Sequence, residues 1–82
     1  MVNSANKLKR RWTILIKVTQ WCKSNGLNKT INEVATEEEA IDFVTDLLSD
    51  FEKEETKRLQ SKGALPSNGY YSKHYFYYII EQ

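Results

Sequence analysis

The feature that most constrains the fold of this chain is the pair Asn25-Gly26, which follows a segment of alternating side chains. Both residues tolerate the positive φ angles of tight turns, so the pair favours an antiparallel hairpin. The preceding segment, residues 12–21, reads W-T-I-L-I-K-V-T-Q-W and is rich in strand-forming residues. Of the two sides of this segment, the one more suited to face the core carries Trp12, Ile14, Ile16 and Val18. We therefore expect a first strand over residues 12–21 and a turn over 23–26.

The segment after this turn, roughly residues 27–35, predicts a second strand that is shorter and more polar. Its apolar residues Leu27, Ile31 and Val34 do not keep strict alternation. This irregular spacing is typical of an edge strand with a bulge.

The sequence Thr36-Glu37-Glu38-Glu39 is a capping box and predicts the start of a helix. Apolar residues then recur at spacings of three and four, which indicates an amphipathic helix with a broad buried face. Gly63 is a typical C-terminal stop, so we expect one helix over residues 37–62. Between residues 52 and 62 only Leu59 is apolar. We therefore expect the last turns either to project beyond the sheet or to fray.

All five tyrosines lie between Tyr70 and Tyr78, within a segment that predicts a final strand over residues 70–82. One side carries Tyr70, His74, Phe76, Tyr78 and Ile80, and the other carries Tyr71, Lys73, Tyr75, Tyr77 and Ile79. The pattern leaves open which side is buried, because a shift of one residue exchanges them.

The expected order is therefore strand, strand, helix, strand. It predicts an α+β domain over residues 12–82, preceded by a flexible basic arm over residues 1–11. The three strands would form an antiparallel sheet of order 2-1-3, with one long helix on one face. The other face would have no protein cover, and function is expected there.

Charge is separated along the chain although the net charge is only +1. Residues 1–35 hold seven basic residues and one acidic residue, whereas residues 36–59 hold nine acidic and three basic residues. Two surfaces of opposite sign could each steer a different partner. The alternative is a solvated helix face beside a basic arm.

If the side carrying Tyr71 is the open one, aromatic rings and cations lie together on the uncovered sheet face. The predicted contact anchors are Trp21, Tyr71, Tyr75 and Tyr77, and the predicted steering cations are Lys9, Arg10, Arg11, Lys17 and Lys73. A second candidate surface is the acidic helix face of Glu38, Glu39, Asp42, Asp46 and Asp50. Carboxylates spaced on a rigid element can dock into a basic groove, as a competitive mimic of nucleic acid would.

Catalysis and metal binding find little support. His74 has no second acid–base partner at a meaningful spacing, and no His or acidic residue lies near Cys22 in the sequence. We expect no enzyme activity, no metal and no cofactor. The single Cys fits a reducing compartment. The apolar stretch of residues 12–21 is too short to cross a membrane and no cleavage site follows it, so we expect a cytoplasmic protein.

These patterns predict a small regulatory protein that docks onto or inhibits a larger macromolecule, with a protein as the expected partner. In size and style such a chain is similar to small phage-encoded or antitoxin-type regulators, although no shared motif supports a family. The main alternative is a binder of single-stranded RNA or DNA that acts through the aromatic strand and the basic arm. A third alternative is a homodimer formed through the last strand at the sheet edge.

Overall fold

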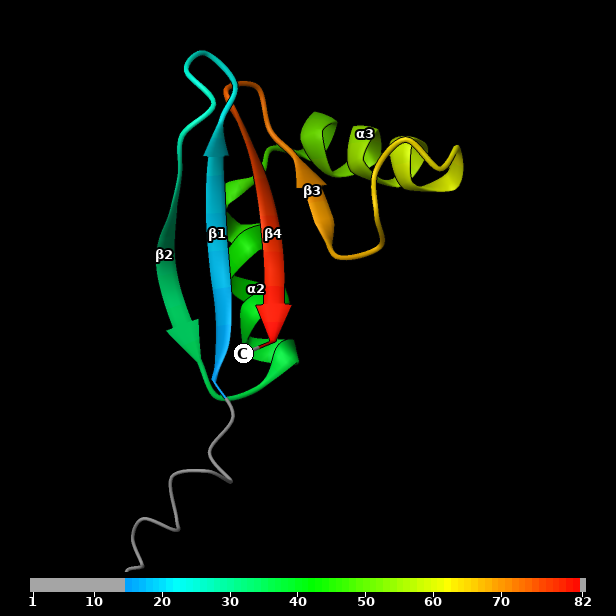
Figure 1. Cartoon of the computed structure of the whole chain (residues 1–82). Helices are drawn as coiled ribbons and strands as arrows, with labels where there is room; N and C mark the ends of the chain where they lie inside the picture. The colour runs from blue at the N-terminus through cyan, green and yellow to red at the C-terminus, as the bar shows by residue number, and fades with distance from the viewer. Residues whose placement is uncertain (1–14, 82) are drawn as a thin grey trace, which may run out of the picture.

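The computed structural model describes residues 15–81, which form an antiparallel sheet and two helices (Figure 1). The elements are β1 (Ile16–Cys22), β2 (Asn28–Val34), α2 (Glu37–Leu47), α3 (Asp50–Ser61), β3 (Gly69–Tyr71) and β4 (Tyr75–Glu81). The sheet has four strands in the order β2-β1-β4-β3. The predicted α+β class and antiparallel sheet are confirmed. The predicted number of strands, three, and of helices, one, is wrong.

The first hairpin forms where the Asn25-Gly26 pair predicts it. The amide of Cys22 donates to the carbonyl of Leu27 at 2.8 Å, and the amide of Gly26 donates to the carbonyl of Cys22 at 2.8 Å. Gly26 has a φ of 73°, which a residue with a Cβ rarely adopts. The expected bulge is also present, because the β1–β2 register shifts between Val18 and Thr19. Trp12 and Ile14 of the predicted first strand lie outside the described residues.

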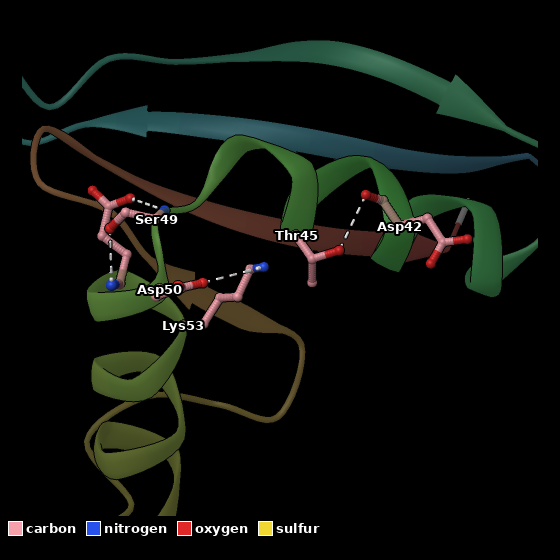
Figure 2. A network of polar contacts seen from close by, with 6 residues as sticks. Asp42, Thr45, Ser49, Asp50 and Lys53 are labelled. Carbon is pink, nitrogen blue, oxygen red and sulfur yellow. Dashed lines mark hydrogen bonds and ion pairs between the residues drawn. The ribbon is translucent and has the colours of Figure 1, made fainter.

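The predicted long helix is instead two helices. The first begins at the predicted capping box, in which the Glu39 amide donates to Oγ1 of Thr36 at 3.2 Å. It ends at Leu48, whose φ of −103° and ψ of 143° are extended. Ser49 then opens α3 with a second capping box: the Glu52 amide donates to Oγ of Ser49 at 3.1 Å, and the Ser49 amide donates to Oε1 of Glu52 at 2.8 Å (Figure 2).

The break has a geometric reason. One straight helix over residues 37–61 would be about 38 Å long, at about 1.5 Å per residue. The three long strands of this sheet have seven residues each and span only about 23 Å. A straight helix that begins at Glu37 would pass the end of such a strand after about 15 residues, so its last turns would extend beyond the sheet. Instead the chain turns, and α3 lies beside β3 rather than over the sheet (Figure 1).

Gly63 ends the second helix, as its position predicts. Its φ is 78°, and its amide donates to the carbonyl of Gln60 at 3.1 Å. The next amide, of Ala64, donates to the carbonyl of Leu59 at 2.9 Å. This pair of hydrogen bonds is a Schellman motif, which satisfies carbonyls that the helix end would otherwise leave free.

The predicted last strand is a second hairpin. The chain reverses over residues 72–74, where the Ser72 amide donates to the carbonyl of Tyr75 at 2.9 Å. Tyr71 therefore pairs with Phe76, and these two residues share a face of the sheet. The interpretation of residues 70–82 as one alternating strand is wrong because the turn restarts the alternation. β4 is also an interior strand, paired with both β1 and β3, so it is not the free edge that the predicted homodimer requires.

The core lies between α2 and the side of β1 and β4 that faces it (Figure 1). It consists of Ile16, Val18, Ala40, Val44, Leu48, Tyr77 and Ile79. On the helix, three of these residues recur at intervals of four, which places them on one face. On β1, the predicted core positions Ile16 and Val18 are 8% and 0% exposed, so that part of the prediction is confirmed.

α3 closes the outer edge of β3. Oγ1 of Thr56, a residue that is only 4% exposed, accepts the Tyr71 amide at 2.9 Å and donates to the Glu52 carbonyl at 2.8 Å. One turn later, Nε2 of Gln60 donates to the carbonyl of Gly69 at 2.9 Å. Edge strands expose unpaired backbone groups that invite further pairing. Two side chains of α3 thus satisfy this edge and hold β3 in place.

Candidate docking surface

The side of the sheet opposite α2 is not covered by either helix, and we refer to it as the open face (Figure 1). Its side chains alternate with the core residues along each strand. They belong to Lys17, Thr19, Trp21, Asn28, Thr30, Glu33, Tyr71, Phe76, Tyr78 and Ile80. Five of these ten residues are aromatic or aliphatic, and Ile80 is 42% exposed. Glu33 is the one acidic residue among them, and it lies opposite Lys17 in the register.

An aromatic row crosses three adjacent strands of the open face. The ring centroids of Trp21 on β1 and Phe76 on β4 are 5.8 Å apart, and those of Phe76 and Tyr71 on β3 are 6.2 Å apart. This row forms because each residue is a cross-strand neighbour of the next. Such aromatic pairs contribute about 0.5–1.5 kcal/mol each beyond the area they bury.

Lys23 places a cation over this row. Its Nζ lies 4.0 Å from the ring centroid of Tyr71 and 4.5 Å from that of Phe76. The same Nζ donates to the carbonyl of Ser72 at 2.6 Å. Burial lowers the pKa of Lys23, and the charge of Glu52 partly opposes this shift. The contacts tie the first hairpin turn to the second and keep an ammonium group at the aromatic row.

Tyr78 forms a second aromatic position in the middle of the open face. It pairs with Thr19 on one side and with Gly69 on the other. A Cβ at Gly69 would lie 3.0 Å from Cε1 of Tyr78 and 3.2 Å from two carbon atoms of Leu65. The glycine is therefore required for close packing, because it lets the Tyr78 ring approach the backbone of β3.

The structure divides the predicted contact anchors between the two sides of the sheet. Trp21 and Tyr71 lie on the open face, together with the predicted cation Lys17. The placement of Tyr75 and Tyr77 beside them is wrong: Tyr77 is 5% exposed within the core, and Tyr75 packs against that core. Lys73 is exposed in the turn between β3 and β4. The predicted cations Lys9, Arg10 and Arg11 lie outside the described residues.

Four residues of this surface were missed as contact residues by the sequence reasoning: Lys23, Phe76, Tyr78 and Ile80. The alternation did group the last three on one side of the final strand. What the pattern lacked was the turn over residues 72–74, which moves Tyr71 onto that side. In the sequence Ser72-Lys73-His74 only the serine favours a turn, and it does so more weakly than Gly, Pro or Asn.

The predicted acidic helix face is divided by the helix break. Glu38, Glu39, Asp42 and Asp46 lie on α2, whereas Asp50 begins α3 and pairs with Lys53 at 4.0 Å (Figure 2). The carboxylate of Glu39 is engaged in the capping box, where its Oε1 accepts a hydrogen bond from the Thr36 amide at 3.2 Å. The five carboxylates are therefore not a row on one rigid helix.

The charge separation is nevertheless organised by layer. Residues 37–61, which span both helices, hold nine acidic and three basic residues. The remaining described residues, those of the strands and their connections, hold five basic and two acidic residues. The segment of the two helices is therefore net negative, and the remaining described residues are net positive.

Cys22 and His74, the two residues considered for catalysis, each contact a different side chain. Sγ of Cys22 lies 3.1 Å from Oγ of Ser24, and this hydrogen bond lowers the pKa of Cys22. The exposed ring of His74 contacts that of Tyr75 edge-on, with centroids 6.4 Å apart. Within residues 15–81, no group of three or more His, Cys, Asp or Glu side chains could hold a metal ion. Among the same residues, neither helix is long and apolar enough to span a membrane.

Comparison with known proteins gives no relative for this chain. No protein-family model matches it, and no curated protein or solved structure shows a significant match.

Proposed function

We propose that this protein is a non-enzymatic binding module that docks onto a larger macromolecule through the open face and thereby regulates it. The observation that carries the proposal is the cluster of Trp21, Tyr71, Phe76, Tyr78 and Ile80 on a sheet face that the helices do not cover. Contiguous apolar surface on a small protein marks an interaction site. Tyrosine and tryptophan are also the residues that most often dominate binding energy at interfaces.

The way in which this surface is held favours docking over chemistry. The aromatic row is fixed by strand pairing, by Lys23 and by the side chains of α3 that anchor β3. A surface that is ordered before binding loses less side-chain entropy when a partner arrives. The ten open-face residues include no Cys, Ser or His, and their one pair of opposite charge, Lys17 and Glu33, lies away from the aromatic row. Recognition is therefore the activity that their chemistry serves.

Site-directed photocrosslinking in the source cells tests this surface and captures whichever molecule occupies it. A benzophenone amino acid placed at Thr30 or Ile80 probes the open face. The same amino acid at Asp46 or Lys57, exposed positions on α2 and α3, is the matched control. We expect discrete adducts of higher mass from the open-face positions only. Adducts that are equal from both sets, or absent from the open face, would contradict the proposal.

A further inference from the structure

We infer that the occupant of the open face is a single-stranded nucleic acid, an inference that rests on the docking role proposed above. The open face combines the two chemical groups that such a ligand requires. Unpaired bases stack on aromatic rings, and phosphates bind cations and hydroxyl or amide donors. Both kinds of group occur on the same side of this sheet, on neighbouring strands.

The rings lie next to one another across the strands without being coplanar: Trp21 and Phe76 are tilted by 33°, and Phe76 and Tyr71 meet edge-on at 69°. Tyr71, Phe76 and Trp21 follow one another from β3 through β4 to β1 with centroid separations of 6.2 and 5.8 Å. Tyr78 lies two residues further along β4 on the same side. Lys23 already lies over the rings of Tyr71 and Phe76, so Trp21 and Tyr78 are the rings on which we expect bases to stack. Base–aromatic stacking does not depend on sequence.

The polar groups of the same face suit a polyanion. Lys23 holds its ammonium group 4.0 Å from the Tyr71 ring centroid, so a phosphate next to a stacked base would meet a cation there. Lys17 supplies a second cation toward the other end of β1. Thr19, Thr30 and Asn28 add hydroxyl and amide groups between the two. The single carboxylate, Glu33, lies beside Lys17, away from the aromatic row.

The distribution of charge also favours binding of the nucleic acid on the sheet side of the molecule rather than on the helix side. Nine of the acidic residues belong to the segment of α2 and α3, so the helices repel phosphate while the sheet does not. Duplex nucleic acid keeps its bases stacked on one another, which removes the surfaces that the rings would contact. The open face should therefore prefer single strands.

Fluorescence anisotropy with a labelled mixed-sequence single strand of about 12 nucleotides tests this inference in the full chain. We expect Trp21→Ala to weaken binding about 5- to 150-fold, the loss of one stacked base, and Trp21→Phe to weaken it much less. The matched control is Phe51→Ala, because Phe51 is an aromatic residue that is 69% exposed but lies on α3. It should bind as the wild type does.

The salt dependence separates phosphate contacts from stacking. Each phosphate contact to a single strand contributes about −0.7 to the slope of log K against log salt concentration. Lys23→Gln should reduce the slope by about that amount, whereas Lys53→Gln on α3 should leave it unchanged. The four basic residues Lys7, Lys9, Arg10 and Arg11 are present in every variant, so differences between variants report the open face alone.

Three results would overturn the inference: wild-type affinity for Trp21→Ala, an equal loss for Phe51→Ala, or equal affinity for duplex. Thermal unfolding confirms that each variant is folded. If Trp21→Ala does not fold, Thr30→Glu serves instead, because it adds a carboxylate at an exposed open-face position. Its binding should be weaker than that of the wild type at low salt, and unchanged binding would contradict the inference.

The crosslinked adducts distinguish failure of this inference from failure of the docking role. Open-face adducts that nuclease shortens support a nucleic-acid occupant. Open-face adducts whose mass nuclease leaves unchanged leave the docking role standing and overturn the nucleic-acid inference. No open-face adducts at all contradict both.

Discussion

Thr56→Val should destabilise the protein although it keeps the shape of the side chain. Thr56 is 4% exposed, and its hydroxyl accepts the Tyr71 amide at 2.9 Å while donating to the Glu52 carbonyl at 2.8 Å. Valine removes both bonds and leaves the Tyr71 N–H buried at the strand edge without a partner. An unsatisfied buried donor costs about 1–3 kcal/mol. We expect the free energy of unfolding to fall by about that amount.

Thr56→Ser is the complementary variant at the same site, because it keeps the hydrogen bonds and changes the packing. Serine keeps the hydroxyl and loses one methyl group, which costs about 0.8 kcal/mol of burial. If the hydrogen bonds dominate, the valine variant is the less stable of the two, whereas if packing dominates, the serine variant is. The order of the two stabilities therefore decides between the explanations.

Urea unfolding at 25 °C measures the effect on stability. With a slope of about 1 kcal/mol per molar urea for a chain of this size, the valine variant should lose about 1–3 M in its midpoint. Amide hydrogen exchange locates the effect: the Tyr71 amide should lose protection in the valine variant and retain it in the serine variant. A valine variant as stable as the wild type, with a protected Tyr71 amide, would refute the reasoning.

Three further perturbations probe the rest of the fold. Val44→Ala removes two methyl groups at a site that is 0% exposed and should cost about 2–3 kcal/mol in thermal or urea unfolding, whereas Ile41→Ala, at a 37% exposed site, should cost much less. Gly63→Ala forces a Cβ into a φ of 78° and should lower the unfolding free energy by about 1–2 kcal/mol. Hydrogen bonds lower the pKa of Glu52, and burial partly opposes this shift. The largest contribution comes from the Ser49 amide, and smaller ones come from the Lys73 amide and the Ser49 and Ser72 hydroxyls. The stabilisation by the Glu52 carboxylate is therefore present above the pKa of an unfolded Glu, about 4.3, and is lost as pH falls through the lower folded value. Glu52→Gln should remove that part of the acid sensitivity in urea unfolding measured across pH, and an unchanged pH profile would contradict this assignment.

The same carboxylate links the fold to the docking surface. Glu52 caps α3 and also accepts the Lys73 amide at 2.8 Å and the Ser72 hydroxyl at 3.3 Å with Oε2. The turn over residues 72–74 positions both Tyr71 and Phe76 on the open face. Loss of this carboxylate should therefore disturb the aromatic row as well as the helix start.

Features that depend on a few adjacent residues could be predicted from the sequence alone. The hairpin at Asn25-Gly26, the capping box at Thr36 and the stop at Gly63 each rest on the conformational preference of one residue and its near neighbours. The alternation of Ile16 and Val18 toward the core likewise holds because side chains alternate along any uninterrupted strand. Distant parts of the chain do not change these preferences.

The second capping box shows where local signals compete. Ser49-Asp50-Phe51-Glu52 carries the same signature as Thr36 to Glu39, but apolar spacing continues through it and predicts an unbroken helix. The tertiary structure decides between the two outcomes. The helix has no core to cover beyond Leu48, whereas the free edge of β3 can be satisfied by Thr56 and Gln60 only if α3 turns aside.

The candidate docking surface was decided by tertiary contacts. The turn that places Tyr71 beside Phe76 has only Ser72 as a turn-forming residue of its own. It is held by Oε2 of Glu52, which accepts the Lys73 amide, and by Nζ of Lys23, which donates to the Ser72 carbonyl at 2.6 Å. These groups are distant in sequence and come together only when both hairpins and α3 have formed. For this reason the sequence showed that the last segment was aromatic, and only the folded chain determined which rings face outward.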